Sequence, residues 1–193
     1  MALSTGSNKI KTAVFISGTG SNLNSLIKFS KLKKSPITID IIISNNSKSE
    51  GLNFGKIYKI KKKIFDFKKN TSSEKEILIE LQKNKVNLIC LAGFMKILSK
   101  NFINNFNGKI LNIHPSLLPK YKGLNTHEKA IKNKDNYSGC TVHFVNSKLD
   151  SGKIINQKKV KIDKKDTPKT LAKKILAQEH KLYPKAILKI FSL

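Results

Sequence analysis

Short apolar runs separated by polar turns dominate the first part of the chain. The runs at residues 12–16, 37–43, 86–92 and 109–113 carry few charged side chains. Strands that are buried on both faces of a parallel sheet show this pattern, whereas half-exposed strands alternate apolar and polar residues. We therefore predict four buried strands.

Helical spacing follows the first of these runs. Leu23, Leu26 and Ile27 lie one helical turn apart behind the polar turn 17–22, and residues 74–81 form a second amphipathic stretch. Alternation of strand and helix predicts parallel strands joined by right-handed crossovers. The expected fold is Rossmann-like α/β, a mostly parallel sheet flanked by helices.

The last third of the chain has a different pattern. Residues 140–145 and 154–162 alternate more and are separated by the turn-like segment 150–152. We expect strands that extend the sheet, with an antiparallel arrangement as one option. Pro168 favours the start of a long C-terminal helix, and Pro184 predicts a bend or break in it. Without repeats or linkers, residues 1–193 are expected to form a single domain.

The net charge of the chain is +26, and all 38 basic residues are Lys. A basic chain can indicate nucleic-acid binding, but such proteins generally use Arg for bidentate contacts with phosphate and guanine. Because the lysines are spread along the whole chain, a compositional bias with a solvated surface is favoured. No specific nucleic-acid partner is expected.

Signals for a membrane or for secretion are not found in the sequence. No run of about 18 apolar residues occurs, and residues 1–11 lack the apolar segment of a secretory signal. Cys90 and Cys140 stand alone in apolar surroundings, as reduced core cysteines do. We expect a cytoplasmic protein without a membrane partner or a metal centre.

Polar residues gather where the predicted parallel strands end, which is where open α/β sheets bind ligands. The turn 17–22 (SGTGSN) has glycines at 18 and 20, so helix-start N–H groups could face an anion. Leu23 replaces the third glycine of the dinucleotide fingerprint, and the Walker pattern is missing. The turn is either a plain connector or a site for a single phosphate.

Asn112 and His114 form the second candidate. Residues at i and i+2 of an extended segment project the same way, so an amide N–H and a protonated imidazole could together stabilise an oxyanion. A nearby carboxylate would favour the charged imidazole. Asp150 is a candidate, although its spacing alone favours an ordinary turn residue, and His143 is expected to be structural.

Five ordered blocks carry a resemblance to a known family: VFISGTGSNL, LAGFMKILS, LNIHPSLLPKYKGLNTHEKAI, VHFVNSKLDSGKII and QEHKLYP. Together they closely resemble the folate-dependent phosphoribosylglycinamide formyltransferases. The resemblance implies transfer of a formyl group from the co-substrate 10-formyltetrahydrofolate to the amine of glycinamide ribonucleotide, in purine synthesis. A monomer or homodimer is expected.

By position, the resemblance implies roles for individual residues. Asn112 and His114 would hold the oxyanion, and Asp150 would raise the pKa of His114. Contacts with the ribonucleotide are implied for Gly20, Ser21, Asn22, Gln178 and Glu179. The folate pocket would be lined by Met95, Lys96, Ile97, Leu98, Asn112, Asn146, Leu149 and Asp150. Lys122 stands where many relatives have Pro, and no Arg opens the helix near Ser73.

Other functions share part of these features. Methionyl-tRNA formyltransferases have the same Asn, His and Asp, but normally add a C-terminal domain that is not expected here. Formyltetrahydrofolate deformylases usually have an N-terminal regulatory domain and a different residue after the His, where Pro115 stands. A Lys-rich nucleic-acid-binding module is the alternative outside the enzymes.

Overall fold

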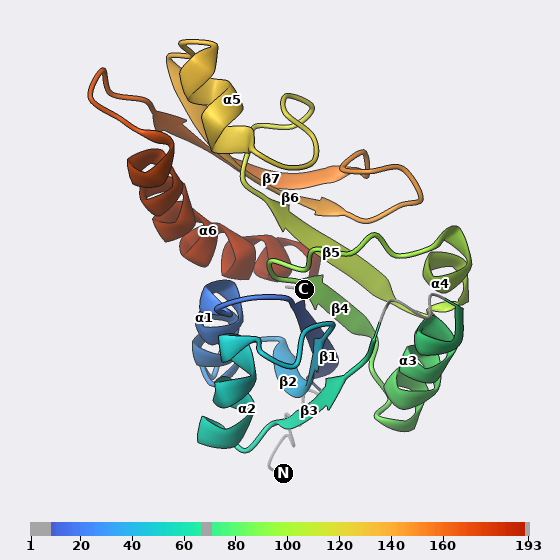
Figure 1. Ribbon diagram of the computed structural model, residues 1–193. Coiled ribbons are helices and arrows are strands. Elements are labelled where there is room, and N and C mark those ends of the chain that lie inside the picture. Colours follow the sequence, from blue (N-terminus) through green and yellow to red (C-terminus); the bar gives the residue numbers. More distant parts are fainter. Residues whose placement is uncertain (1–8, 67–70, 192–193) are drawn as a thin grey trace.

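A seven-stranded sheet forms the centre of the molecule (Figure 1). The computed structural model describes residues 9–66 and 71–191. The strands are β1 (Ile10–Ile16), β2 (Ile37–Ser44), β3 (Lys61–Ile64), β4 (Leu88–Leu91), β5 (Lys109–His114), β6 (Tyr137–Phe144) and β7 (Ile154–Lys161). Their order is β3-β2-β1-β4-β5-β6-β7, and β1 to β5 are parallel. β6 pairs antiparallel with β5 and with β7. The predicted Rossmann-like, mostly parallel sheet is therefore confirmed, and the late strands take the antiparallel arrangement.

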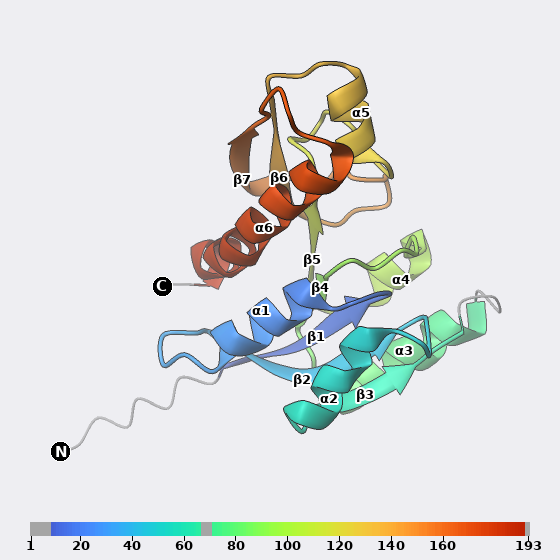
Figure 2. The same ribbon diagram turned by 60° about the vertical axis from the view of Figure 1, so that its left-hand side comes forward.

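Helices cover both faces of the sheet (Figures 1 and 2). α1 (Ser21–Ser30) and α6 (Pro168–Phe191) pack on one face, and α3 (Thr71–Lys83) and α4 (Lys100–Asn105) on the other. Alternate residues of β1 enter the two cores: Val14 and Ile16 face the α1/α6 side, whereas Ala13 and Phe15 face the α3/α4 side. This two-sided burial explains the continuous apolar run in the sequence.

Five elements lie outside the predicted pattern: η1 (Glu50–Leu52), α2 (Asn53–Ile57), α4, α5 (Thr126–Lys132) and strand β3. All four residues of β3, KKKI, are exposed. The strand pairs with β2 at one edge of the sheet through its backbone. Lysine-rich edge strands resist pairing with other chains. Because none of its side chains is buried, β3 has no apolar pattern by which the sequence could predict it.

Of the bend or break predicted at Pro184, the break is wrong, because α6 continues from Pro168 to Phe191. A proline lacks the N–H that would bond the carbonyl four residues earlier, which here belongs to His180. Ser25 of α1 donates its hydroxyl to that carbonyl at 2.8 Å. The neighbouring helix therefore satisfies the group that the proline leaves without a partner.

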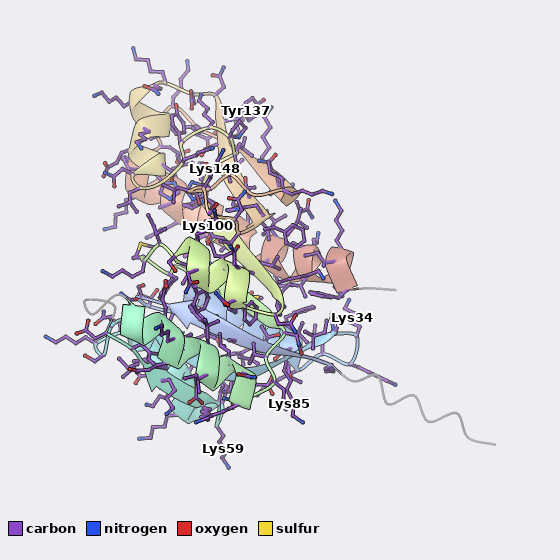
Figure 3. All side chains as sticks on the ribbon, turned by 90° about the vertical axis from the view of Figure 1, so that its right-hand side faces the viewer. Lys34, Lys59, Lys85, Lys100, Tyr137 and Lys148 are labelled. Atoms are coloured by element: carbon purple, nitrogen blue, oxygen red, sulfur yellow. The ribbon has the colours of Figure 1, made fainter. Side chains whose placement is uncertain are left out.

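Exposed lysines occur along the whole of the described chain, and Figure 3 labels five of them. The labelled residues Lys34, Lys59, Lys85, Lys100 and Lys148 are all exposed, and they lie in loops or, in the case of Lys100, at the start of α4. The expected spread of charge is thus present in the fold. In the described ranges, no helix is long and apolar enough to cross a membrane.

Candidate active site

A cavity of about 780 Å³ opens at the carboxyl ends of the parallel strands. Its lining includes Asn22 behind β1, residues 93–98 behind β4, and Asn112 and His114 of β5. The three segments singled out in the sequence therefore meet at one place. The loop between β6 and β7, α5 and Glu179 of α6 complete the wall.

Asn112, His114 and Asp150 lie together in this cavity. The His114 Nδ1 is 3.4 Å from Asp150 Oδ2, and the Asn112 amide donates to Asp150 Oδ1 at 3.4 Å. His143 joins them: its Nε2 lies 3.2 Å from the Asn112 amide nitrogen and 3.6 Å from Asp150 Oδ1. Both the His114 and Asp150 side chains are only 7% exposed.

Sheet register and a turn bring these side chains together. β5 and β6 are antiparallel and pair Asn112 directly with His143, so the two side chains leave the sheet on the same face. Asp150 comes from the loop after β6 and has a left-handed backbone, with φ of 44°. It is a turn residue, as its spacing indicated, and it also faces His114.

Hydrogen bonds keep Asp150 ionised. Burial would raise the pKa of its carboxyl, but His143, the backbone N–H of Gly123 at 2.8 Å and His114 together hold that pKa below its usual range. A carboxylate that accepts several hydrogen bonds is stabilised in its charged form. The cavity therefore contains a fixed negative charge beside His114.

His114 differs from the expectation. Burial lowers the pKa of its imidazole, and this effect outweighs the opposite effects of the Tyr121 carbonyl and of Asp150. Asp150 thus favours the charged imidazole, as the resemblance implied, but the net direction is downward. In the free protein burial favours neutral His114, and a negative charge that develops beside the ring would favour its protonated form.

Opposite this group, α1 begins in a tight turn. Gly20 has φ of 73°, and a Cβ on it would lie 2.7 Å from the Cα of Gly51, so this position accepts only glycine without strain. Asn22 on the first turn of α1 donates to Glu179 Oε2 at 2.7 Å. Burial raises the pKa of the Glu179 carboxyl, opposed in part by that bond.

The mouth of the cavity is apolar. Met95, Ile97, Leu124 and Leu149 line it and are all more than half exposed. Exposed large apolar side chains gathered around a cavity mark a binding site for a ligand with an apolar face.

Comparison with known proteins agrees with this geometry. Residues 10–187 match the family model described as formyl transferase. The chain belongs to the formyl transferase family.

Named relatives extend the comparison. The phosphoribosylglycinamide formyltransferase of Haemophilus influenzae is 44% identical over 180 residues, which is 92% of this chain and 85% of that protein. The human trifunctional purine biosynthetic protein adenosine-3 is 42% identical over 93% of this chain, which spans only 18% of that protein's length. A solved phosphoribosylglycinamide formyltransferase from Brucella melitensis superposes with a TM-score of 0.89 at 39% identity, covering 95% and 96% of the two chains.

Within this formyl transferase, most predicted site residues reach the cavity. All eight expected folate-pocket residues line it, and so do Asn22 and Glu179. The described residues of the lining do not include Gly20, Ser21 or Gln178. Gly20 and Ser21 form the start of α1 beside Asn22 instead.

Sequence reasoning missed two groups of this formyl transferase site. His143 is buried and bonded, as predicted for a structural residue, but it also contacts Asn112 and Asp150. Alternation in residues 140–145 places it on a sheet face, and only the antiparallel pairing with β5 shows which one. The second group is the Tyr121 carbonyl, which accepts from His114 Nε2 at 2.8 Å. A pattern of side chains in the sequence cannot predict a contact that a backbone carbonyl makes.

Proposed function

We propose that this protein transfers the formyl group of 10-formyltetrahydrofolate to the primary amine of glycinamide ribonucleotide, in de novo purine synthesis. The observation that carries the proposal is the convergence of Asn112, His114 and Asp150 in one cavity of a formyl transferase fold. Residues 1–193 would act as one domain, because segments far apart in the sequence, from Asn22 to Glu179, contribute to that cavity. A cytoplasmic location fits these small-molecule substrates.

The two substrates would enter from different sides. The apolar mouth around Met95, Ile97 and Leu149 suits the flat ring system of a folate. The Gly20 turn presents the free N–H groups of a helix start, which suit one phosphate. Asn22 and Glu179 line the cavity, are bonded to each other, and offer hydrogen bonds to the rest of the ribonucleotide.

Formyl transfer would proceed by direct attack. The neutral amine nitrogen bonds to the formyl carbon, and the formyl oxygen becomes an oxyanion held by the Asn112 amide and by protonated His114. Preorganised donors of this kind stabilise the transition state without reorganisation. The bond from carbon to the folate nitrogen then breaks, and the amine proton passes to that nitrogen through a water held by Asp150.

Asp150 and burial have opposite effects on the pKa of His114 in this mechanism. Burial lowers the pKa of His114 and so favours its neutral form in the free protein. The Asp150 carboxylate, 3.4 Å away, then stabilises the imidazolium as the oxyanion forms. Solvent supplies this proton as the oxyanion forms, and His114 returns it to solvent when the oxyanion collapses and the bond to the folate nitrogen breaks.

The assay is a mixture of the protein, glycinamide ribonucleotide and 10-formylfolate, in which folate absorbance reports transfer. His114→Ala should retain the wild-type circular dichroism and lose about 100- to 1,000-fold in turnover. Near-normal turnover in that variant would refute the mechanism. Formate release without an amine acceptor would instead indicate a deformylase, and formylation of methionyl-tRNA would indicate the tRNA enzyme.

A further inference from the structure

The three-residue segment 121–123 touches both His114 and Asp150. The Tyr121 carbonyl accepts from His114 Nε2 at 2.8 Å, and the Gly123 N–H donates to Asp150 Oδ2 at 2.8 Å. His114 comes from β5 and Asp150 from the loop before β7. Their separation of 3.4 Å therefore depends on where this short segment lies.

Tyr121 has a backbone that needs support from its surroundings. Its φ is 56°, a left-handed conformation that is unfavourable for a residue with a Cβ. Such a conformation persists only where other contacts hold it. The carbonyl that meets His114 points as it does because of this conformation.

A clamp of polar side chains holds Tyr121 in place. Its hydroxyl donates to Asp135 Oδ2 at 2.8 Å and accepts from the Asn133 amide at 2.7 Å. Asp135 is further fixed by Lys120, whose Nζ is 2.7 Å from Oδ1. These groups lie at the end of α5, remote in sequence from the catalytic strand.

The preceding part of the loop has anchors of its own. The Leu118 N–H donates to Thr141 Oγ1 at 3.1 Å, and Gln157 donates to the Leu118 carbonyl at 2.9 Å. Ser116 donates to the Lys120 carbonyl at 2.6 Å. Ser116 also donates to the Tyr121 carbonyl at a longer 3.3 Å, and Lys122 donates to Ser151 at 2.6 Å. The Tyr121 hydroxyl, with bonds of 2.8 Å and 2.7 Å, is the anchor that ties the residue in contact with His114 to the end of α5.

We propose that Tyr121 is a positioning residue for formyl transfer, whose hydroxyl, clamped by Asp135 and Asn133, keeps its carbonyl on His114 Nε2. This proposal rests on the proposed function. A carbonyl oxygen can only accept a hydrogen bond, so neutral His114 carries its proton on Nε2. The free base is then Nδ1, the nitrogen that faces Asp150.

Losing this contact would change the chemistry of His114 in two ways. The proton could move to Nδ1, which would leave the basic nitrogen on the wrong side of the ring. The positive ring would also lose an acceptor that favours it. The other groups that face His114 are Asp150, which favours its charged form, and His143, His127 and Lys129, which do not.

The test uses Tyr121→Phe and Asp135→Ala, which each remove the bond between hydroxyl and carboxylate. Tyr58→Phe is the matched control. The Tyr58 hydroxyl donates to Asn24 Oδ1 at 3.2 Å, and neither residue lines the cavity. Nitrogen-15 NMR of the free protein reports the tautomer and titration of His114. Steady-state kinetics with glycinamide ribonucleotide and 10-formylfolate report kcat and KM.

Both test variants should lower kcat by about 10- to 100-fold, since small displacements of catalytic groups have effects of this size, with little change in KM. The His114 pKa should fall and the proton on Nε2 should become partly delocalised to Nδ1. The double variant should be no worse than either single one, because both remove the same interaction. Asp135→Asn keeps an acceptor and should restore most of the turnover, and Tyr58→Phe should match the wild type.

An unchanged His114 tautomer and titration in both folded test variants would overturn the proposal, and so would wild-type kcat alongside altered NMR signals. If the wild-type protein transfers no formyl group to glycinamide ribonucleotide, the proposed function fails. The NMR measurement, which needs no substrate, still decides whether Tyr121 sets the state of His114.

Discussion

Replacing Asp150 with Asn tests the electrostatic core of the site. The substitution removes one negative charge 3.4 Å from His114 Nδ1 and keeps a side chain of the same shape. It also keeps an oxygen that can accept from the Gly123 N–H. The loop should therefore hold its conformation, and the change isolates the charge.

The size of the effect follows from Coulomb's law. Two unit charges 3.4 Å apart at an effective dielectric constant of about 20 attract each other by about 5 kcal/mol. Part of this attraction is already offset by the burial of both groups. A loss of about 3 to 4 kcal/mol of transition-state stabilisation remains, which corresponds to a decrease of roughly 100- to 1,000-fold in kcat.

The assay is single-turnover formyl transfer, with folate absorbance followed across a range of pH. Without the carboxylate the pKa of His114 should fall further, because Asp150 is one of the groups that raise it. The residual activity should therefore have its optimum at a lower pH than the wild type. A folded Asp150→Asn protein with wild-type turnover, or with an unchanged pH optimum, would refute the electrostatic role.

Three other predictions concern stability. Glu179→Gln should raise the melting temperature at neutral pH, because burial raises the pKa of this carboxyl, and should weaken ribonucleotide binding in calorimetry; a lower melting temperature would contradict the first part. Gly20→Ala should lower the free energy of unfolding in urea by roughly 1–3 kcal/mol, since the position has φ of 73° and no room for a Cβ; an unchanged midpoint would show that the turn relaxes. Burial lowers the folded-state pKa of His114, His127 and His180 below 6.5, so their contribution to stability is complete above that pH and is lost as the pH falls from 6.5 through the folded values. His180→Gln should make the melting temperature less sensitive to acid between about pH 7.5 and about pH 5.5, and an equally steep dependence would argue against this linkage.

The central strands could be predicted because burial on both sides leaves a signal in the sequence. Val14 and Phe15 enter opposite cores, and the apolar run that contains them is what such burial requires. Strand β3 has no such signal, since an edge strand pairs through backbone atoms that every residue type supplies. The contact of the Tyr121 carbonyl with His114 could not be predicted for the same reason, because every residue type has a backbone carbonyl.

The catalytic groups divide in the same way. Asn112 and His114 share one strand, so their common direction follows from spacing alone. Asp150 reaches His114 only because its loop folds back over the sheet, which is a tertiary relation that no local pattern contains. Family resemblance supplied that relation for Asp150. To predict that His143 contacts Asn112, one would need the register of the two antiparallel strands β5 and β6.

The bond between Ser25 and the His180 carbonyl makes the evolutionary history of α6 depend on order. Replacing Pro184 by a residue with an N–H would restore the helix's own bond and leave Ser25 dispensable. Losing Ser25 first would leave a carbonyl without its partner, at a cost of about 1–3 kcal/mol. Lineages of this protein should therefore acquire Pro184 only when Ser25 is already present. They should lose Ser25 only after Pro184 has been replaced.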